Sequence, residues 1–192
     1  MVRLKEYSRH DVLDKAIGLF CEKGYKASSM TDIVRVTGLN TASMYKEFGD
    51  KDGLFIESLE HYRDITLAPR IKLLIDEPNL KGVKTCLEDI IDGTKSDDFM
   101  GCLMMNHLTQ KKSISAKVNK IITDFCSDME KLFETALRNA QANGEIPLSK
   151  EPAELASVVM FFIHGFVLYG RHQNVENKMP KFYEIVMQTL QN

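Results

Sequence analysis

The feature of this sequence that most limits its fold is an apolar pattern with the period of an α-helix. Between Arg9 and Lys23, apolar side chains recur every three or four residues and so fall on one helical face. Beyond Pro69 the pattern continues in longer segments, and no alternation of the β-strand type appears. With 44% hydrophobic residues in a chain of 192, a sizeable core can form. We therefore predict an all-α fold of about nine helices.

Three short helices are expected within the first fifty residues. Gly24 is placed to end the first helix and Ser29 to cap the second, where the Asp32 carboxylate complements the free N–H groups of the first turn. Gly38 permits a sharp turn, after which Asn40 caps the third helix. This succession is the layout of a three-helix unit that ends in a helix-turn-helix.

The third helix, from Thr41 to Phe48, has two different faces. Met44 and Phe48 are apolar and share one face. The residues of the other face are small, polar or basic: Thr41, Ala42, Ser43, Tyr45 and Lys46. Such a face can enter a DNA major groove about 12 Å wide and reach base edges and phosphates. We therefore predict a helix-turn-helix DNA-binding domain over residues 1–49.

The charge of the chain limits how it can bind DNA. Its 25 basic and 27 acidic residues give a net charge of -2, and the first fifty residues are also nearly balanced. A uniformly basic surface is excluded, so binding has to depend on the positions of a few charges.

Residues 50–192 are predicted to form a larger helical domain. Helices are expected from Asp50 toward Pro69, at Leu80 to Gly93, at Gly101 to Gln110, at Ser115 to Asn143, after Pro152, and at Met179 to Leu190. The helix after Pro152 is apolar on almost every side and so needs a cover on every side. We predict that the last two helices form a homodimer interface; the alternative is a core helix buried within one subunit.

Neither a membrane span nor a metal site is expected. The longest nearly apolar run, Leu155 to Tyr169, is shorter than the roughly 20 residues that cross a bilayer. The N-terminus lacks the apolar segment of a secretion signal, so we expect a cytoplasmic protein. The cysteines show no metal-site spacing and are expected to be free thiols, with a redox sensor as the alternative: Cys21, Cys86, Cys102 and Cys126. No cofactor is indicated.

Several segments strongly resemble the TetR family of transcriptional regulators. They are Ala16 to Tyr25, Ser29 to Ile33, Gly38 to Asn40 and Met44 to Leu54, which cover the first third of the chain. Gly101 to Asn106 and Leu137 to Ile146 are similar to one subgroup of that family. The resemblance implies a DNA-binding domain joined to a helical domain, residues 50–192, that binds an effector and forms a homodimer.

The resemblance also implies roles for individual residues. Thr31 and Lys51 would meet phosphates, Thr41, Ala42 and Ser43 would lie at base edges, and Tyr45 and Lys46 would contact the DNA backbone. Asn40 and Thr41 stand where the family often has a serine and a basic residue. Glu47 stands where the family often has a histidine or a neutral polar residue. Because a carboxylate repels DNA, Glu47 is expected to point away from it or to weaken binding.

The effector site is expected among the C-terminal helices. Its candidate residues give an apolar, polarizable wall with two histidines: Met104, Met105, His107, Phe125, Met129, Phe161, Phe162 and His164. This wall fits a small, apolar or aromatic effector. The predicted protein is a repressor that binds an inverted repeat in double-stranded DNA as a homodimer and is released by that effector.

The alternatives to a DNA-binding regulator are an enzyme and a helical protein-interaction module. An enzyme is disfavoured, because the sequence has no HExxH, phosphate-binding glycine loop, GxSxG or Cys-His-Asp grouping. A helical protein-interaction module would explain the apolar C-terminal helices, but it leaves the polar face between Thr41 and Lys46 without a purpose.

Overall fold

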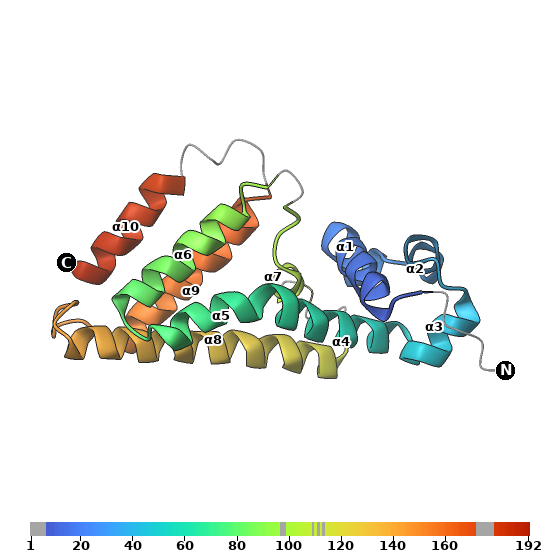
Figure 1. Cartoon of the computed structure of the whole chain (residues 1–192), viewed down its shortest axis with the longest axis horizontal. Helices are drawn as coiled ribbons and strands as arrows, with labels where there is room; N and C mark the ends of the chain where they lie inside the picture. The colour runs from blue at the N-terminus through green and yellow to red at the C-terminus, as the bar shows by residue number, and fades with distance from the viewer. Residues whose placement is uncertain (1–6, 97–98, 109, 111, 113, 172–178) are drawn as a thin grey trace. The chain divides into compact units, whose positions relative to one another are not determined.

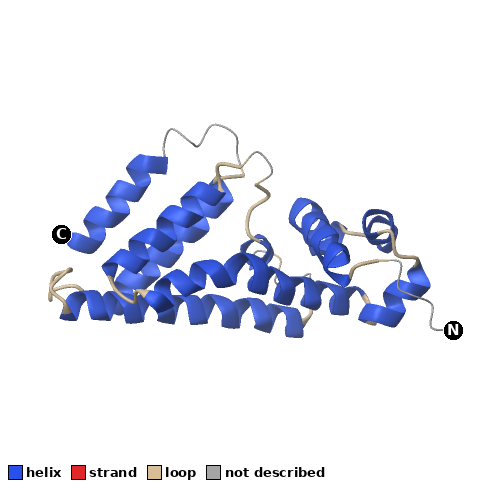
Figure 2. Ribbon diagram, in the orientation of Figure 1, coloured by secondary structure: helices blue, strands red, loops and turns tan. Residues whose placement is uncertain are grey.

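A computed structural model describes residues 7–96, 99–108, 110, 112, 114–171 and 179–192. Within these ranges all regular secondary structure is helical, as Figure 2 shows. The elements are α1 (Arg9–Ala27), α2 (Met30–Thr37), α3 (Thr41–Phe48), α4 (Lys51–Tyr62), the π-helical η1 (Arg63–Leu67), α5 (Ala68–Asp76), α6 (Leu80–Gly93), α7 (Leu103–Leu108), α8 (Ala116–Ala142), α9 (Pro152–Tyr169) and α10 (Met179–Gln191). The all-α prediction is confirmed.

The helix that begins at Lys51 is longer than expected. It was predicted to run toward Pro69, but α4, η1 and α5 follow one another without a break to Asp76. Pro69 lies in the first turn of α5, a position that tolerates proline, and the π-helical turn η1 directly precedes it. When this run is counted once, the described residues contain nine helices, as expected.

The chain divides into two compact units. One unit contains the residues up to Thr66 together with Cys102–Ile122, and the other contains Leu67–Gly101 and Thr123–Asn192. The predicted functional division into residues 1–49 and 50–192 stays a prediction, because this grouping reflects packing and not role.

The first unit is built around α1, which packs along α4 and also contacts α2 and α7. Phe20 of α1 and Phe55 of α4 are fully buried, and their rings meet edge to face with centroids 4.7 Å apart. Gly24 has φ 79°, so α1 is kinked there and continues to Ala27, beyond its predicted end.

The predicted helix caps of this unit are present. The Ser29 hydroxyl accepts from the Asp32 N–H, and Gly38 ends α2 in the left-handed conformation. Asn40 Oδ1 accepts from the Ser43 N–H at 2.8 Å at the start of α3. These local bonds explain why one helix ends and the next begins twice between Ala27 and Thr41.

In the second unit α6, α9 and α10 lie side by side (Figure 1). Phe166 of α9 and Met179 of α10 are buried against Ile90, Ile91 and Phe162. By length and composition alone α9 could cross a membrane, since its 18 residues have a mean hydropathy of 1.5. Its buried residues recur every three or four positions, which is also the pattern of a helix packed in a protein core.

Candidate nucleic-acid interface

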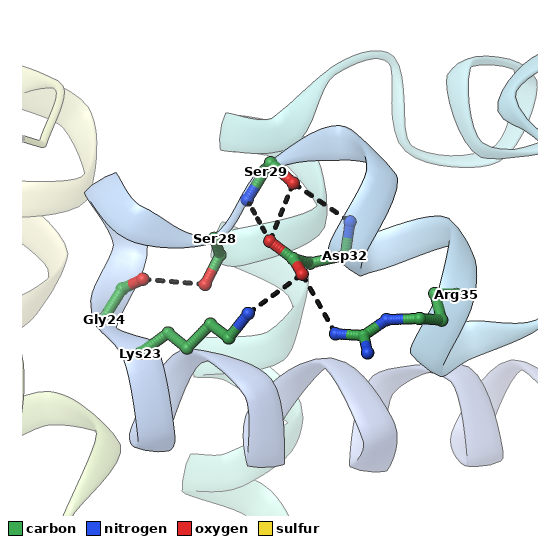
Figure 3. A network of polar contacts seen from close by, with 6 residues as sticks. All are labelled: Lys23, Gly24, Ser28, Ser29, Asp32 and Arg35. Carbon is green, nitrogen blue, oxygen red and sulfur yellow. Dashed lines mark hydrogen bonds and ion pairs between the residues drawn. The ribbon is translucent and has the colours of Figure 1, made fainter.

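The start of α2 is held to α1 by a polar network (Figure 3). The Asp32 carboxylate accepts from the Ser29 N–H at 3.1 Å, from Lys23 Nζ at 2.9 Å and from Arg35 Nη2 at 3.0 Å. The bonds from Lys23 and Ser29 hold the pKa of Asp32 far below its usual range. Thr31, the second residue of α2, is exposed beside this network.

A second contact in Figure 3 closes the turn before α2. The buried Ser28 hydroxyl donates to the Gly24 carbonyl at 2.7 Å, so the two residues between α1 and α2 have little freedom. Together the two contacts fix the helix that braces α3.

The two faces predicted for α3 are present. Met44 and Phe48 are buried, whereas Thr41, Ala42, Tyr45 and Lys46 are exposed, Tyr45 to 49%. Ser43 is half-buried, because its position lies at the border of the two faces. The four exposed residues lie on consecutive turns of α3 and form one small, mainly polar surface. A helix with this surface is sterically free to enter a groove.

Glu47 forms an ion pair within the protein. Its carboxylate lies 3.1 Å from Arg9 Nη1, and only 14% of its side chain is exposed. Arg9 also pairs with Glu57 and lies over the Phe48 ring, 4.7 Å from its centre. The repulsion of DNA expected from Glu47 is thereby reduced. The sequence gives no signal for the pair of Arg9 and Glu47, because the two residues lie 38 positions apart.

Lys51, at the first turn of α4, is held against an aromatic ring. Its ammonium lies 4.3 Å from the centre of the Tyr25 ring, and partial burial lowers its pKa. The Tyr25 hydroxyl donates to the Asp52 carboxylate. Burial, together with that bond, raises the pKa of the Tyr25 hydroxyl well above its usual value. Periodicity gave no signal for this grouping, because the contacts join α1 to α4.

The residues predicted to contact an effector fall in both units. Within the first, Met104 and His107 are buried and Met105 is half-buried, all on α7. Both ring nitrogens of His107 are engaged: Nε2 accepts from the Tyr25 N–H at 3.0 Å, and Nδ1 lies 2.7 Å from the Leu103 carbonyl. A direct contact between His107 and an effector would require one of these bonds to break.

Within the second unit, His164 of α9 has an unused polar atom. Its Nε2 is buried and finds no hydrogen-bond partner among the residues that the structure describes. Burial lowers the pKa of His164, and the Glu130 carboxylate opposes that shift. Glu130 also accepts a hydrogen bond from Ser157 at 2.5 Å. On α8, Phe125 is half-buried and Met129 is buried.

Phe161 and Phe162 line an open apolar pocket between α9 and α10. Its volume is about 330 Å³, and its other lining residues are Gly165, Phe166, Tyr169, Met179 and Phe182. His164 is not among them. Aromatic walls of this kind favour a flat apolar group.

The cysteines and acidic residues give no metal cage in the part of the chain that the structure describes. None of the four cysteines forms a disulfide. Burial raises the pKa of the Cys86 thiol to about 12, so that thiol is unreactive in the folded protein.

The sequence matches a known family at its N-terminal end. Over residues 12–57 it fits the model described as bacterial regulatory proteins, tetR family. The chain is similar to the HTH-type transcriptional repressor ComR of Escherichia coli, with 32% identity over 174 residues, which are 88% of this chain and 82% of that protein. It is 20% identical to the HTH-type transcriptional repressor DhaR of a Mycobacterium species over 182 residues, 95% of this chain and 91% of that one.

Solved structures share the fold. A cysteine mutant of the transcriptional regulator CifR, in complex with a 26-base-pair operator duplex, superposes with a TM-score of 0.85 at 23% identity and covers 97% of this chain and 98% of its own. Reduced NemR of Escherichia coli gives a TM-score of 0.80 at 16% identity, with 94% and 96% covered.

Proposed function

The chain belongs to the TetR family of bacterial regulatory proteins, and from that membership we propose that it is a repressor which binds an inverted-repeat operator as a homodimer and leaves it when a small effector binds. A DNA-binding transcriptional regulator, and not an enzyme, is the function that family membership establishes. The repressor names of its relatives and the operator complex of CifR support the finer proposal, which includes a cytoplasmic location for this chain.

The exposed polar face of α3 is the observation that carries this proposal. Thr41, Ala42 and Ser43 would meet base edges, where small side chains allow the helix close to the groove floor. Tyr45 and Lys46 would contact the DNA backbone. Thr31 from α2 and Lys51 from α4 would hold phosphates on either side and so set the register of the helix.

A homodimer through α9 and α10 is supported by the apolar side chains that one chain leaves uncovered. Phe161 is 76% exposed, and Leu168, Tyr169, Phe182 and Ile185 are each about half exposed. Burial of exposed apolar groups of this size against a second copy of the chain lowers the free energy and so favours a dimer. A twofold dimer would carry two copies of α3 to successive major grooves about 34 to 36 Å apart, which requires an inverted repeat.

Release by an effector needs only modest coupling. A coupling free energy of about 1 to 3 kcal/mol between effector binding and operator binding changes operator affinity by about 5- to 150-fold. The candidate contacts are Met104, Met105, His107, Phe125, Met129, Phe161, Phe162 and His164. Of these, His164 has the buried ring nitrogen that a hydroxyl or amine of a ligand could satisfy.

Selection from a random DNA duplex library tests the proposal. The parent protein should enrich an inverted repeat, whereas Tyr45→Ala and Lys46→Ala should lose that enrichment at the same salt concentration. Lys131→Ala is the matched control, because this lysine is also exposed to solvent but lies on α8 in the other unit. A failure of the parent protein to enrich any sequence over a range of salt concentrations would refute operator binding.

A further inference from the structure

His107 is a buried hydrogen-bond acceptor in the first unit. It belongs to α7 and has no exposed surface. The Leu103 carbonyl, 2.7 Å from Nδ1, can only accept, so Nδ1 carries the ring proton. Nε2 is therefore unprotonated, and its lone pair accepts from the backbone N–H of Tyr25 at 3.0 Å. The ring also packs against Phe55, with centroids 4.7 Å apart.

The bond from Tyr25 lies at the kink of α1. Gly24 departs from helical geometry with φ 79° and ψ 162°, and the N–H that follows it is directed at His107. The segment after α7 also approaches this point, since a Cβ at position 24 would lie 2.8 Å from Gln110 Nε2. One hydrogen bond and one close approach thus connect the α7 region to the end of α1.

Tyr25 in turn organises the start of α4. Its hydroxyl donates to Asp52, its ring lies under the Lys51 ammonium at 4.3 Å, and the same ring lies 5.1 Å from that of Phe55. A shift of the Tyr25 backbone therefore moves the surface on which Lys51 rests. The chain of contacts runs from His107 through Tyr25 to Lys51 without leaving the first unit.

From this arrangement we infer that His107 is a positioning residue for operator binding: its bond to Tyr25 holds Lys51 where it meets a DNA phosphate. This inference rests on the proposed function, which assigns Lys51 to a phosphate. A movement of α7 that breaks the bond between His107 and Tyr25 would therefore also weaken the contact between Lys51 and the phosphate. His107 itself touches neither DNA nor a ligand in this role.

Two conservative variants isolate the bond to Tyr25. In His107→Gln the amide oxygen can reach the position of Nε2 and accept from Tyr25, whereas in His107→Asn the shorter side chain reaches only the position of Nδ1. Leu103→Ala is the matched control for stability, because it removes a fully buried side chain from the same helix but none of the groups that form the two His107 hydrogen bonds. Thermal unfolding of each variant shows how much of any effect is loss of fold.

The readout is operator affinity as a function of salt, measured on the operator that the parent protein selects. Because each phosphate contact contributes about 0.9 to the slope of log affinity against log salt, loss of Lys51 from both subunits lowers that slope by about 1.8. We expect Lys51→Ala and His107→Asn to show this lower slope, together with weaker operator affinity. His107→Gln should recover most of the slope, and Leu103→Ala should keep it despite a lower Tm.

Combining the variants sharpens the test. If His107 acts through Lys51, the pair His107→Asn and Lys51→Ala should bind no more weakly than Lys51→Ala alone, whereas independent effects would add. An unchanged slope in a folded His107→Asn protein, or additive losses in the double variant, would overturn the inference. A parent protein that binds no DNA would refute the proposed function instead, so the two failures are distinct.

Discussion

Replacing Asn40 by alanine should weaken operator binding about 30-fold by loosening the first turn of α3. Asn40 is the N-cap of this helix, and its Oδ1 accepts from the Ser43 N–H at 2.8 Å. With only eight residues, α3 is too short to be stable by itself, so the loss of its cap frays the turn that contains Thr41 and Ala42.

The magnitude follows from the cap and from the proposed twofold symmetry. Loss of an N-cap costs about 1 kcal/mol per helix. Both copies of α3 in a dimer have to regain their first turn on DNA, which costs about 2 kcal/mol in total. Because each 1.4 kcal/mol changes affinity about tenfold, this cost corresponds to about 30-fold weaker binding. The free energy of unfolding should fall by about 1 kcal/mol per chain.

Fluorescence anisotropy on the selected operator, beside urea denaturation, measures both quantities. Asn40→Ser is the control, since a serine hydroxyl also caps the Ser43 N–H without adding charge. Because no phosphate contact is lost, the salt dependence should stay that of the parent. The reasoning is refuted if Asn40→Ala binds as tightly as the parent, or if Asn40→Ser loses as much affinity as the alanine variant.

Three further predictions concern other parts of the molecule. Phe161→Asp should convert the proposed dimer to a monomer in sedimentation experiments, whereas Leu148→Asp, at a side chain 85% exposed outside the helices, should not; a dimeric Phe161→Asp protein would contradict the α9–α10 interface. Burial lowers the pKa of His107, so the unfolded chain binds a proton from about pH 6.5 downward that the folded chain resists. The free energy of unfolding should therefore fall as pH falls below about 6.5. In urea titrations His107→Phe should flatten that dependence but not abolish it, because His164 has a pKa shift of the same sign. Cys86 should react with a maleimide only as fast as the protein unfolds, which mass spectrometry in increasing urea can follow; rapid labelling of the native protein would show that the thiol is accessible.

The local features of the fold were predictable because they depend on neighbours in the chain. The capping box of α2, the left-handed Gly38 and the Asn40 cap each involve groups within four residues of one another. The separation of Met44 and Phe48 from the polar side of α3 follows from 3.6 residues per turn. These short-range rules were enough to predict a helix-turn-helix and its exposed face.

Contacts between distant segments were decided only by the tertiary structure. Glu47 meets Arg9 across 38 residues, and His107 meets the Tyr25 backbone across 82. From the sequence, His107 was a polar group in an apolar stretch and so a candidate for an effector, whereas the fold gives both of its nitrogens to the protein. Periodicity assigns a side chain to the inside or the outside of its own helix, but its partner depends on which other helix packs there. Which helix packs there depends on the whole core. Burial of apolar surface favours many close-packed arrangements equally, and only the packed helices determine which buried polar groups can form hydrogen bonds.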